Sequence, residues 1–484
     1  MERDACIISL DIGTSGCRAV AVDKKGCRVA QYAEVLSPLR PSKGCSQYDG
    51  ESWLRIQQRV VRHVIDQVGV SKVAALAIAS QRSTVVLWDK ETGQPLAPVL
   101  TWEDGRSAQE AASAPVAQPQ VHQITGLYKT PFFSASKILW AIKHVPAVAQ
   151  ALKKGTLLAA PVPSYFIWHA SKKHVFATDY TMAQRMLLLD IRTRTWSEPL
   201  CKAFQISPSI LPTLCSSADD FGTYEYKGYS IPIYACVGDQ QSAAFWQQLE
   251  KGASCINYGT GAFWLYNAGN KSALLDGMLT SLAASEADRK QDYLLEGTVN
   301  AAGSALLWLK TKGFSFEENE VQSLCEKSKN PVLFLPALGG LGAPYFDFNV
   351  SAAAENLTPH TGKSDWVAGV VRGIVCLLAD IGTYLQANGF PLTGPVAISG
   401  GLSQIPYLAQ FQADVLQRPL IVLSQQDATV LGAAKLAARH MQWDDAAWHT
   451  TEVTSTVEPQ MLPAEAQTLY VSWQKFVQRI RTGK

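Results

Sequence analysis

The chain has 484 residues, more than a single hydrophobic core normally accommodates, so two large domains are expected. Charged residues make up 17% of the sequence and the formal net charge is +2, which argues against the concentrated basic face of a nucleic-acid-binding protein. Ten cysteines without a Cys-x-x-Cys pair predict reduced thiols rather than disulfides or a zinc site.

Two features predict a cytoplasmic protein that does not enter the membrane. The N-terminal residues lack the apolar segment of a signal peptide. The apolar run from Val367 to Leu385 is interrupted by Arg372 and Asp380, which is typical of a core helix rather than a membrane span.

The N-terminal half begins with a strand over 5–10, a glycine-containing turn over 11–16, and a second strand over 18–22. A third strand begins at Val29. The following elements are a helix over 52–68, a buried strand over 73–79, a strand and hairpin turn over 85–95, mostly helical sequence over 106–160 with a connector at 115–120, and a strand over 231–237. The sequence pattern is that of an α/β protein.

The C-terminal half has a comparable set of elements. Helices are predicted over 301–310, 365–386, 406–416 and 428–439, and strands over 332–336 and 395–399. Its start repeats the start of the chain, because 256–263 and 10–16 both read as a strand, a polar residue and a Gly-Thr turn. This echo indicates a duplicated fold with a cleft between the copies. Chance similarity of two short glycine-rich turns is the alternative.

The two Gly-Thr turns are candidates for phosphate binding. Glycine lets backbone N–H groups point at a phosphate without obstruction, and threonine and serine hydroxyls add donors. Asp11 ends the first strand, where a carboxylate can hold Mg²⁺ together with phosphate oxygens. The alternative is an ordinary Asp-x-Gly hairpin turn.

Asp239 follows a predicted strand and Gly238, and a helix of small residues begins after it. A carboxylate there can accept the proton of a hydroxyl that attacks phosphorus. The alternative role is a helix N-cap.

Ser399-Gly400-Gly401-Leu402 links a strand to a helix, and it could receive a flat adenine and ribose. An ordinary strand–helix turn is equally compatible with it. Neither a Walker A sequence nor Gly-x-Gly-x-x-Gly after a first strand is present, which disfavours P-loop ATPases and dinucleotide dehydrogenases.

Polar residues also follow strands in the first half, at 80–84 and 102–106. The carboxyl ends of strands are where α/β proteins bind ligands, and these segments offer Arg, Asp and Trp to a sugar. A solvated loop with ion pairs is the alternative.

Together these segments resemble the FGGY family of carbohydrate kinases over most of the chain, from about Ile7 to Ala438. The segments that carry the resemblance are Leu10–Thr14 with Arg18, Lys137-x-x-Trp140, Gly238–Gln241, Asn257–Gly261 and Ser399–Gly401. The resemblance implies two actin-like (ribonuclease H-like) ATPase domains with an interdomain cleft. The expected boundaries are a sugar- or polyol-binding domain over 1–246, an ATP-binding domain over 247–440, and a helical tail over 441–484 packed on the core.

The resemblance also implies the site residues. Asp239 would be the catalytic base, and Asp11 would hold Mg²⁺. The residues expected to bind the acceptor are Gln81, Arg82, Ser83, Trp102, Asp104, Phe132, Asp239, Gln240 and Phe263. Those expected to bind ATP are Asp11, Thr14, Ser15, Arg18, Gly259, Thr260, Gly303, Gly400 and Gly401. The expected partners are ATP and a small sugar or polyol, with neither nucleic acid nor membrane, and a homodimer is compatible with the sequence.

Within the family the chain is similar to glycerol kinases, most clearly at 80–88 and at 339–347, and Trp102–Arg106 is similar to a segment of xylulose kinases. It departs from the glycerol kinase pattern at three positions. Ser83 stands where that branch has Glu, Phe132 where it has Tyr, and Ile405 where it has Asn. The first two changes remove groups that the branch uses on glycerol hydroxyls, and losing the carboxylate alone could cost roughly 10- to 100-fold in glycerol affinity. The third lies in the adenosine segment, so the contacts to adenine are expected to differ from those of glycerol kinases.

The expected function is an ATP-dependent kinase whose acceptor is a small sugar or polyol, with a pocket altered toward a longer polyol or a ketose. Two alternatives stay open. One is a glycerol kinase that tolerates the changes, and the other is a catalytically weak nucleotide-binding sensor or scaffold.

Overall fold

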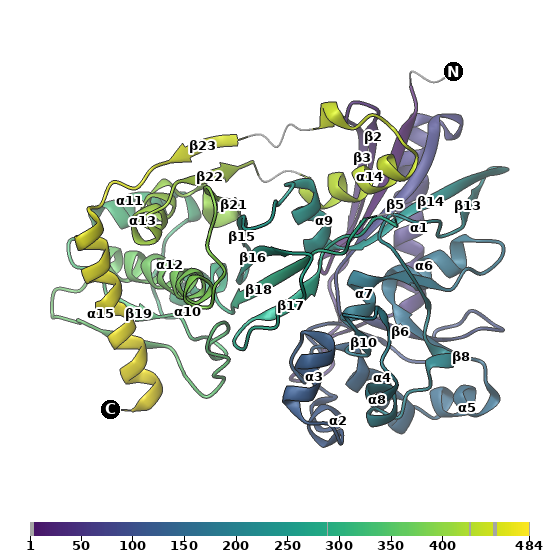
Figure 1. Ribbon diagram of the computed structural model, residues 1–484, viewed down its shortest axis with the longest axis horizontal. Coiled ribbons are helices and arrows are strands. Elements are labelled where there is room, and N and C mark those ends of the chain that lie inside the picture. The colour runs from purple at the N-terminus through teal and green to yellow at the C-terminus, as the bar shows by residue number, and fades with distance from the viewer. Residues whose placement is uncertain (1–3, 288, 425–426, 449–452, 484) are drawn as a thin grey trace. The chain divides into compact units, whose positions relative to one another are not determined.

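The computed structural model describes residues 4–287, 289–424, 427–448 and 453–483 (Figure 1). The chain divides into two compact units. Unit 1 comprises Met1–Gln248, Thr280–Tyr293 and Asp427–Thr450, and unit 2 comprises Leu249–Leu279, Leu294–Gln426 and Thr451–Lys484. Two segments of the C-terminal half, Thr280–Tyr293 and Asp427–Thr450, thus group with unit 1, and the expected boundaries at 246 and 440 stay a prediction.

The main sheet of unit 1 has six strands in the order β13-β14-β5-β1-β2-β3. Their bounds are β1 Cys6–Ile12, β2 Gly16–Asp23, β3 Arg28–Val35, β5 Val73–Ser80, β13 Thr223–Tyr226 and β14 Tyr229–Gly238. Strand β5 lies parallel to both β1 and β14, and β2 runs antiparallel to β1. The last residues of the three parallel strands, Ile12, Ser80 and Gly238, lie side by side in the register.

Both faces of this sheet are covered, which explains why β1 is apolar along nearly its whole length. Ile8 and Leu10 belong to the core shared with α1 (Gly50–Val68), whereas Ile7 belongs to the core shared with α14 (Ala428–His440). Helix α14 packs against β5, β1, β14 and α9 (Asp239–Trp246). A Cβ at Gly432 of α14 would lie 2.0 Å from the Ser242 carbonyl oxygen of α9, so the predicted close packing of this small-residue helix is confirmed.

The rest of unit 1 contains a smaller sheet and short helices. The sheet has the order β4 (Gln47–Tyr48), β7 (Val99–Leu100), β6 (Val85–Asp89) and β8 (Leu157–Pro161). The helices are α2 Ala108–Ser113, α3 Gln118–Thr125, α4 Ser134–His144, α5 Pro146–Lys154, α6 Val162–Ala170, α7 Tyr180–Gln184 and α8 Glu198–Ala203. Short strands are β9 Ala177–Asp179, β10 Leu189–Asp190, β11 Thr195–Trp196 and β12 Thr213–Cys215. The predicted connector at 115–120 ends early, because Pro119 is accommodated in the first turn of α3.

The sheet of unit 2 repeats the arrangement around β1. Strand β15 (Ser254–Tyr258) pairs antiparallel with β16 (Ala262–Gly269) and parallel with β21 (Val396–Gly400), as β1 does with β2 and β5. Beyond them the sheet continues with β18 (Tyr293–Val299) on one side, and with β22 (Leu420–Leu423) and β23 (Val453–Val457) on the other. The echo between the two Gly-Thr turns therefore extends to the strands around them.

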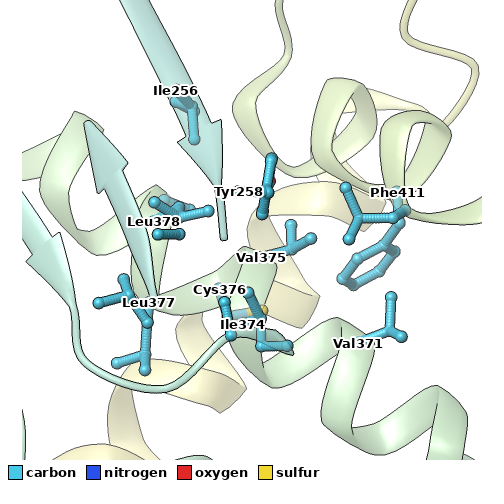
Figure 2. Packing of buried hydrophobic residues seen from close by; sticks show 14 of the residues in the cluster. Ile256, Tyr258, Val371, Ile374, Val375, Cys376, Leu377, Leu378 and Phe411 are labelled. Atoms are coloured by element: carbon cyan, nitrogen blue, oxygen red, sulfur yellow. The ribbon is translucent and has the colours of Figure 1, made fainter. Parts of the chain in front are cut away.

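Helix α12 (Lys363–Ala387) forms the core of unit 2. Figure 2 shows its side chains Val371, Val375 and Leu378 in one apolar cluster with Phe411 of α13 (Pro406–Leu416) and Tyr258 of β15. Among the described residues α12 is the one helix long and apolar enough to cross a membrane, but 83% of its apolar window is buried inside the protein. Its burial agrees with the predicted core helix.

The remaining elements of unit 2 surround α12. They are α10 Gly303–Thr311, α11 Val321–Lys327, α13 Pro406–Leu416 and α15 Pro463–Thr482, with short strands β19 Leu333–Leu335 and β20 Ala353–Glu355. Strand β17 spans Leu279–Leu282. Residues 449–452 and 484 of the predicted tail, and 1–3 at the N-terminus, lie outside the described residues.

The terminal helix α15 is tied to α12 by a buried carboxylate. Asp380 accepts hydrogen bonds from the Tyr470 hydroxyl at 2.7 Å, the Trp473 indole at 3.0 Å and the Tyr345 hydroxyl at 2.9 Å. Burial raises the pKa of Asp380 to about 6, and the three donors oppose that shift.

Candidate active site

The candidate residues of unit 1 follow the aligned ends of its three parallel strands. Asp11 belongs to β1 itself, and the Gly13–Gly16 turn follows that strand. Gln81 to Thr84 follow β5, and Asp239 and Gln240 follow β14. The sheet therefore gathers segments that are more than 200 residues apart in the sequence at one edge, the location where parallel sheets bind ligands.

The turn after β1 is closed by a hydrogen bond from the Gly13 N–H to the Gly16 carbonyl, at 2.9 Å. A Cβ at Gly16 would lie 2.2 Å from the Glu34 carbonyl oxygen on β3, so only glycine fits. The Thr14 carbonyl accepts from the Tyr48 hydroxyl, which fixes the turn from the outside. Ser15 at its tip is exposed, so the turn presents a hydroxyl and backbone groups to solvent.

Asp11 lies opposite Arg18 in the β1–β2 ladder, with 3.8 Å between carboxylate and guanidinium. Burial raises the pKa of Asp11 to about 6, Arg18 opposes the shift, and the carboxylates of Asp239 and Asp427 add to it. A divalent cation would relieve this repulsion, so Asp11 suits the predicted Mg²⁺ site. Among the described residues no group of three or more His, Cys, Asp or Glu could hold a metal alone. The remaining ligands would have to come from phosphate and water.

Arg18 has a partner that sequence reasoning missed. Its guanidinium pairs with Asp427, at 2.5 Å, and Asp427 also pairs with Arg28 at 2.8 Å. Asp427 immediately precedes α14, so packing of that helix on unit 1 brings it to the turn. No motif around position 427 signals this, since the contact joins residues about 400 positions apart.

Gln81 connects the first turn to the predicted acceptor residues. Its side-chain amide donates to the Gly13 carbonyl at 3.0 Å, and its oxygen accepts from the Thr84 hydroxyl at 2.9 Å. The Trp102 indole donates to the Thr14 hydroxyl at 3.0 Å, and the Trp102 backbone N–H donates to Thr84. Gln81 is almost fully buried, and its hydrogen bonds link the turn after β1 to the segment after β5.

Asp239 is the first residue of α9, and Gly238 is the N-cap, so the alternative N-cap role does not apply to Asp239. Its carboxylate is 37% exposed and lies 3.4 Å from the Arg82 guanidinium, which is 10% exposed. The neighbouring Gln240 has a buried side-chain oxygen that lacks a hydrogen-bond partner in the described structure. Such an atom favours a bound donor, as a substrate hydroxyl would be.

Of the other predicted acceptor residues, Trp102 and Phe132 are exposed, whereas Ser83 and Asp104 are buried. The rings of Trp102 and Phe132 are both partly exposed and stack with centroids 6.4 Å apart. Ser83 is nearly buried, with a left-handed φ of 65°. Asp104 is fully buried, where it pairs with Arg106 at 2.8 Å and accepts from the Ser46 N–H at 2.7 Å. The structure thus gives Asp104 partners within the protein rather than an open face.

In unit 2 the second Gly-Thr turn lies against the start of α10. The Gly303 N–H donates to the Gly259 carbonyl at 3.0 Å, and the Ala302 and Ser304 N–H groups donate to the Thr260 carbonyl. A Cβ at Gly303 would lie 2.8 Å from the Gly259 carbonyl oxygen. The carbonyl groups of the turn are thus bonded to the start of α10, whereas Gly259 and Thr260 themselves are exposed to solvent.

The predicted adenosine segment lies beside this turn, because Gly400 pairs with Tyr258 in the parallel β15–β21 ladder. Gly400 has a φ of 97°, and its Cβ would lie 2.1 Å from the Tyr258 carbonyl oxygen, so no other residue fits. Gly401 is exposed, and Ile405 is the N-cap of α13. Phe263, the predicted acceptor wall, is half-buried on β16 in this unit.

Comparison with known proteins identifies the chain. The family model described as the FGGY family of carbohydrate kinases matches with its N-terminal domain over residues 6–246 and its C-terminal domain over 255–441. The chain belongs to the FGGY family of carbohydrate kinases. It is accordingly an ATP-dependent carbohydrate or polyol kinase.

Curated relatives and solved structures agree with this family. A glycerol kinase of Limosilactobacillus reuteri is 33% identical over 492 residues, covering 99% of this chain and 98% of the relative. A crystal structure of Plasmodium falciparum glycerol kinase with ADP has a TM-score of 0.92 at 28% identity, covering 98% of each chain. A ligand-bound xylulose kinase of Lactobacillus acidophilus has a TM-score of 0.87 at 20% identity, with 99% and 98% coverage, and shows the fold alone. The expected pair of actin-like α/β domains is confirmed.

Proposed function

We propose that this FGGY kinase transfers the γ-phosphoryl group of ATP to a hydroxyl of a polyol or ketose longer than glycerol, with Asp239 as the general base. The observation that supports this most directly is the alignment of Ile12, Ser80 and Gly238, which places Asp239, Arg82 and the Asp11 turn after neighbouring strands.

The acceptor would bind to unit 1. Arg82 and Gln240 would hold its hydroxyls, and the faces of Trp102 and Phe132 would contact its carbon chain. When the acceptor oxygen attacks the γ-phosphorus, its proton passes to the Asp239 carboxylate and ADP leaves with the bridging oxygen. The ion pair with Arg82 orients that carboxylate before the substrate arrives.

In each unit a glycine turn would offer backbone N–H groups and hydroxyls to phosphate. The proposed ATP-binding residues of unit 1 are Thr14 and Ser15 of the turn and the Arg18 side chain, and those of unit 2 are Gly259 and Thr260 of the turn and Gly303 of α10. Gly400 and Gly401 would leave room for the adenosine. Asp11 would hold Mg²⁺, which neutralises charge on the phosphate oxygens when it is bound. We place the enzyme in the cytoplasm.

The substrate proposal rests on Ser83 and Phe132. Ser83 stands where glycerol kinases have a carboxylate, and Phe132 lacks the phenolic hydroxyl of their tyrosine. These two positions therefore offer two fewer hydrogen-bonding groups to a three-carbon acceptor. A hydrogen bond to a charged group contributes about 1.5–3 kcal/mol, so the missing carboxylate reduces glycerol affinity by an order of magnitude or more. The space left by the smaller serine suits a longer chain.

Glycerol itself is the second candidate acceptor, because the curated relative that matches over 99% of this chain is a glycerol kinase. A coupled ADP-release assay with ATP and Mg²⁺ separates the two candidates. The acceptor panel is glycerol, erythritol, the five-carbon polyols, xylulose, ribulose and fructose. A higher kcat/KM for an acceptor of four to six carbons supports the proposal, and a micromolar-range KM for glycerol without turnover of the others contradicts it.

A nucleotide-binding sensor would give a third result in the same assay: ATP would bind, but no acceptor would release ADP. Measuring ATP binding calorimetrically alongside turnover distinguishes this result from a misfolded preparation.

A further inference from the structure

Lys137 is a charged side chain in the interior of unit 1, with 0% of its surface exposed. It lies in the second turn of α4, near the positive end of the helix dipole, where a cation is electrostatically unfavourable. Burial lowers the pKa of Lys137 to about 7, and the Asp104 carboxylate opposes that shift. A buried lysine in such a position costs stability unless hydrogen bonds satisfy its ammonium group.

Its ammonium group bonds to two backbone carbonyls from different segments. The Nζ atom donates to the Phe132 carbonyl at 2.6 Å and to the Ser83 carbonyl at 3.2 Å. The Ser134 hydroxyl also donates to the Ser83 carbonyl, at 3.3 Å. Ser83 and Phe132 are two of the three positions at which the chain departs from the glycerol kinase pattern.

The backbone at Ser83 needs such support. A serine at a φ of 65° is in the left-handed region, which costs on the order of 1 kcal/mol or more outside glycine. Donors that hold its carbonyl stabilise this conformation against relaxation. Because a neutral amine carries two N–H groups, Lys137 can serve both carbonyls whether or not it is protonated.

We infer that Lys137 is a positioning residue for the acceptor pocket, which ties the Ser83 and Phe132 segments together and thereby sets the pocket's width. The role in acceptor binding rests on the proposed function, but the hydrogen bonds that join the Ser83 and Phe132 segments are independent of it. Lys137 touches neither substrate nor nucleotide in this account, so its loss acts on the acceptor through Ser83 and Phe132.

The test compares Lys137→Met with Lys129→Met in the full chain. Lys129 is the control, because its ammonium also donates to backbone carbonyls of unit 1, but to those of Val116 at 3.0 Å and Ala114 at 3.3 Å rather than to those of Ser83 and Phe132. Methionine keeps most of the side-chain volume in both variants. Ser134→Ala removes one of the three bonds and should give a weaker version of the Lys137 effect.

Hydrogen exchange of each folded variant is the first measurement. Lys137→Met should increase amide exchange at 81–86 and 130–136 at least tenfold over Lys129→Met, whereas unchanged exchange there would overturn the inference. This result is independent of any substrate, so it stands even if no acceptor of the panel is phosphorylated.

Steady-state kinetics with the best acceptor of the panel and with glycerol is the second measurement. Lys137→Met should raise the acceptor KM at least tenfold with the ATP KM within threefold, and Lys129→Met should change neither. An equal rise of both constants in Lys137→Met would show a merely structural role and would refute the inference.

Discussion

Gly303 offers a direct test of the phosphate-binding role proposed for the second Gly-Thr turn. In Gly303→Ala the new Cβ would lie 2.8 Å from the Gly259 carbonyl oxygen. Carbon–oxygen contacts relax to about 3.4 Å, so the turn and the start of α10 must separate by roughly 0.6 Å. Overpacking of this kind costs about 1–3 kcal/mol. If the free energy of ATP binding is weakened by that amount, the ATP KM rises by about 5- to 150-fold.

The assay is initial-rate ADP release with ATP varied at saturating acceptor, and then the reverse. We expect the ATP KM to rise while the acceptor KM changes less than threefold. Gly362→Ala is the control in the same unit, because its Cβ would meet nothing closer than 4.0 Å, and it should leave both constants unchanged. An unchanged ATP KM in a correctly folded Gly303→Ala would refute the assignment of this turn to ATP.

Two further substitutions test the substrate wall and the core of unit 2. Ser83→Glu introduces the carboxylate that glycerol kinases have at this position and should lower the glycerol KM by about 10- to 100-fold in the ADP-release assay. The neutral control Ser83→Gln should leave the glycerol KM unchanged. Equal effects of the two variants would refute the argument from charge. Asp380 has a folded pKa of about 6 against about 3.8 unfolded, so the folded state binds more protons between pH 4 and 6 and its free energy of unfolding falls as pH rises through that window. Asp380→Asn cannot titrate, so urea unfolding should show its stability relative to the parent protein increasing from pH 4.5 to 7.5 by up to about 2 kcal/mol, and a constant difference would contradict this.

Local sequence patterns predicted most elements of this fold. The expected helix over 406–416 coincides with α13, and the strand over 73–79 ends one residue before β5 does. Apolar periodicity and the Gly and Pro residues at the element ends carry this information, because they depend on neighbours in the chain. The repeat of the Gly-Thr turn also predicted the repeated strand arrangement of the two units.

Contacts between segments that are far apart in the sequence could not be predicted from such local patterns. Helix α14 was predicted as a close-packing helix, but nothing in its sequence indicates that it packs on β1 and β5 of unit 1. The ion pairs of Asp427 follow from that packing. The burial of Lys137 was likewise missed, since a lysine on an amphipathic helix is ordinarily exposed, and the Ser83 carbonyl reaches it only through the packing of the segment after β5.

The sequence predicted which segments form the candidate site, but not the distances and contacts between their side chains. Asp239, Arg82 and Asp11 follow or end neighbouring strands, as the motif order suggested. Asp104 differs, since its carboxylate bonds to Arg106 and Ser46 within the protein. Its binding of the acceptor stays a prediction, and the contacts observed for Gln81 likewise point inward.

The central claim is that Asp239 accepts the proton of the acceptor hydroxyl. The most direct measurement is single-turnover phosphoryl transfer by Asp239→Asn, with ATP and acceptor affinities determined separately. The account predicts a loss of about 10²–10⁴-fold in the rate of transfer, with ATP binding unchanged. Transfer at the rate of the parent protein by a folded Asp239→Asn would contradict it.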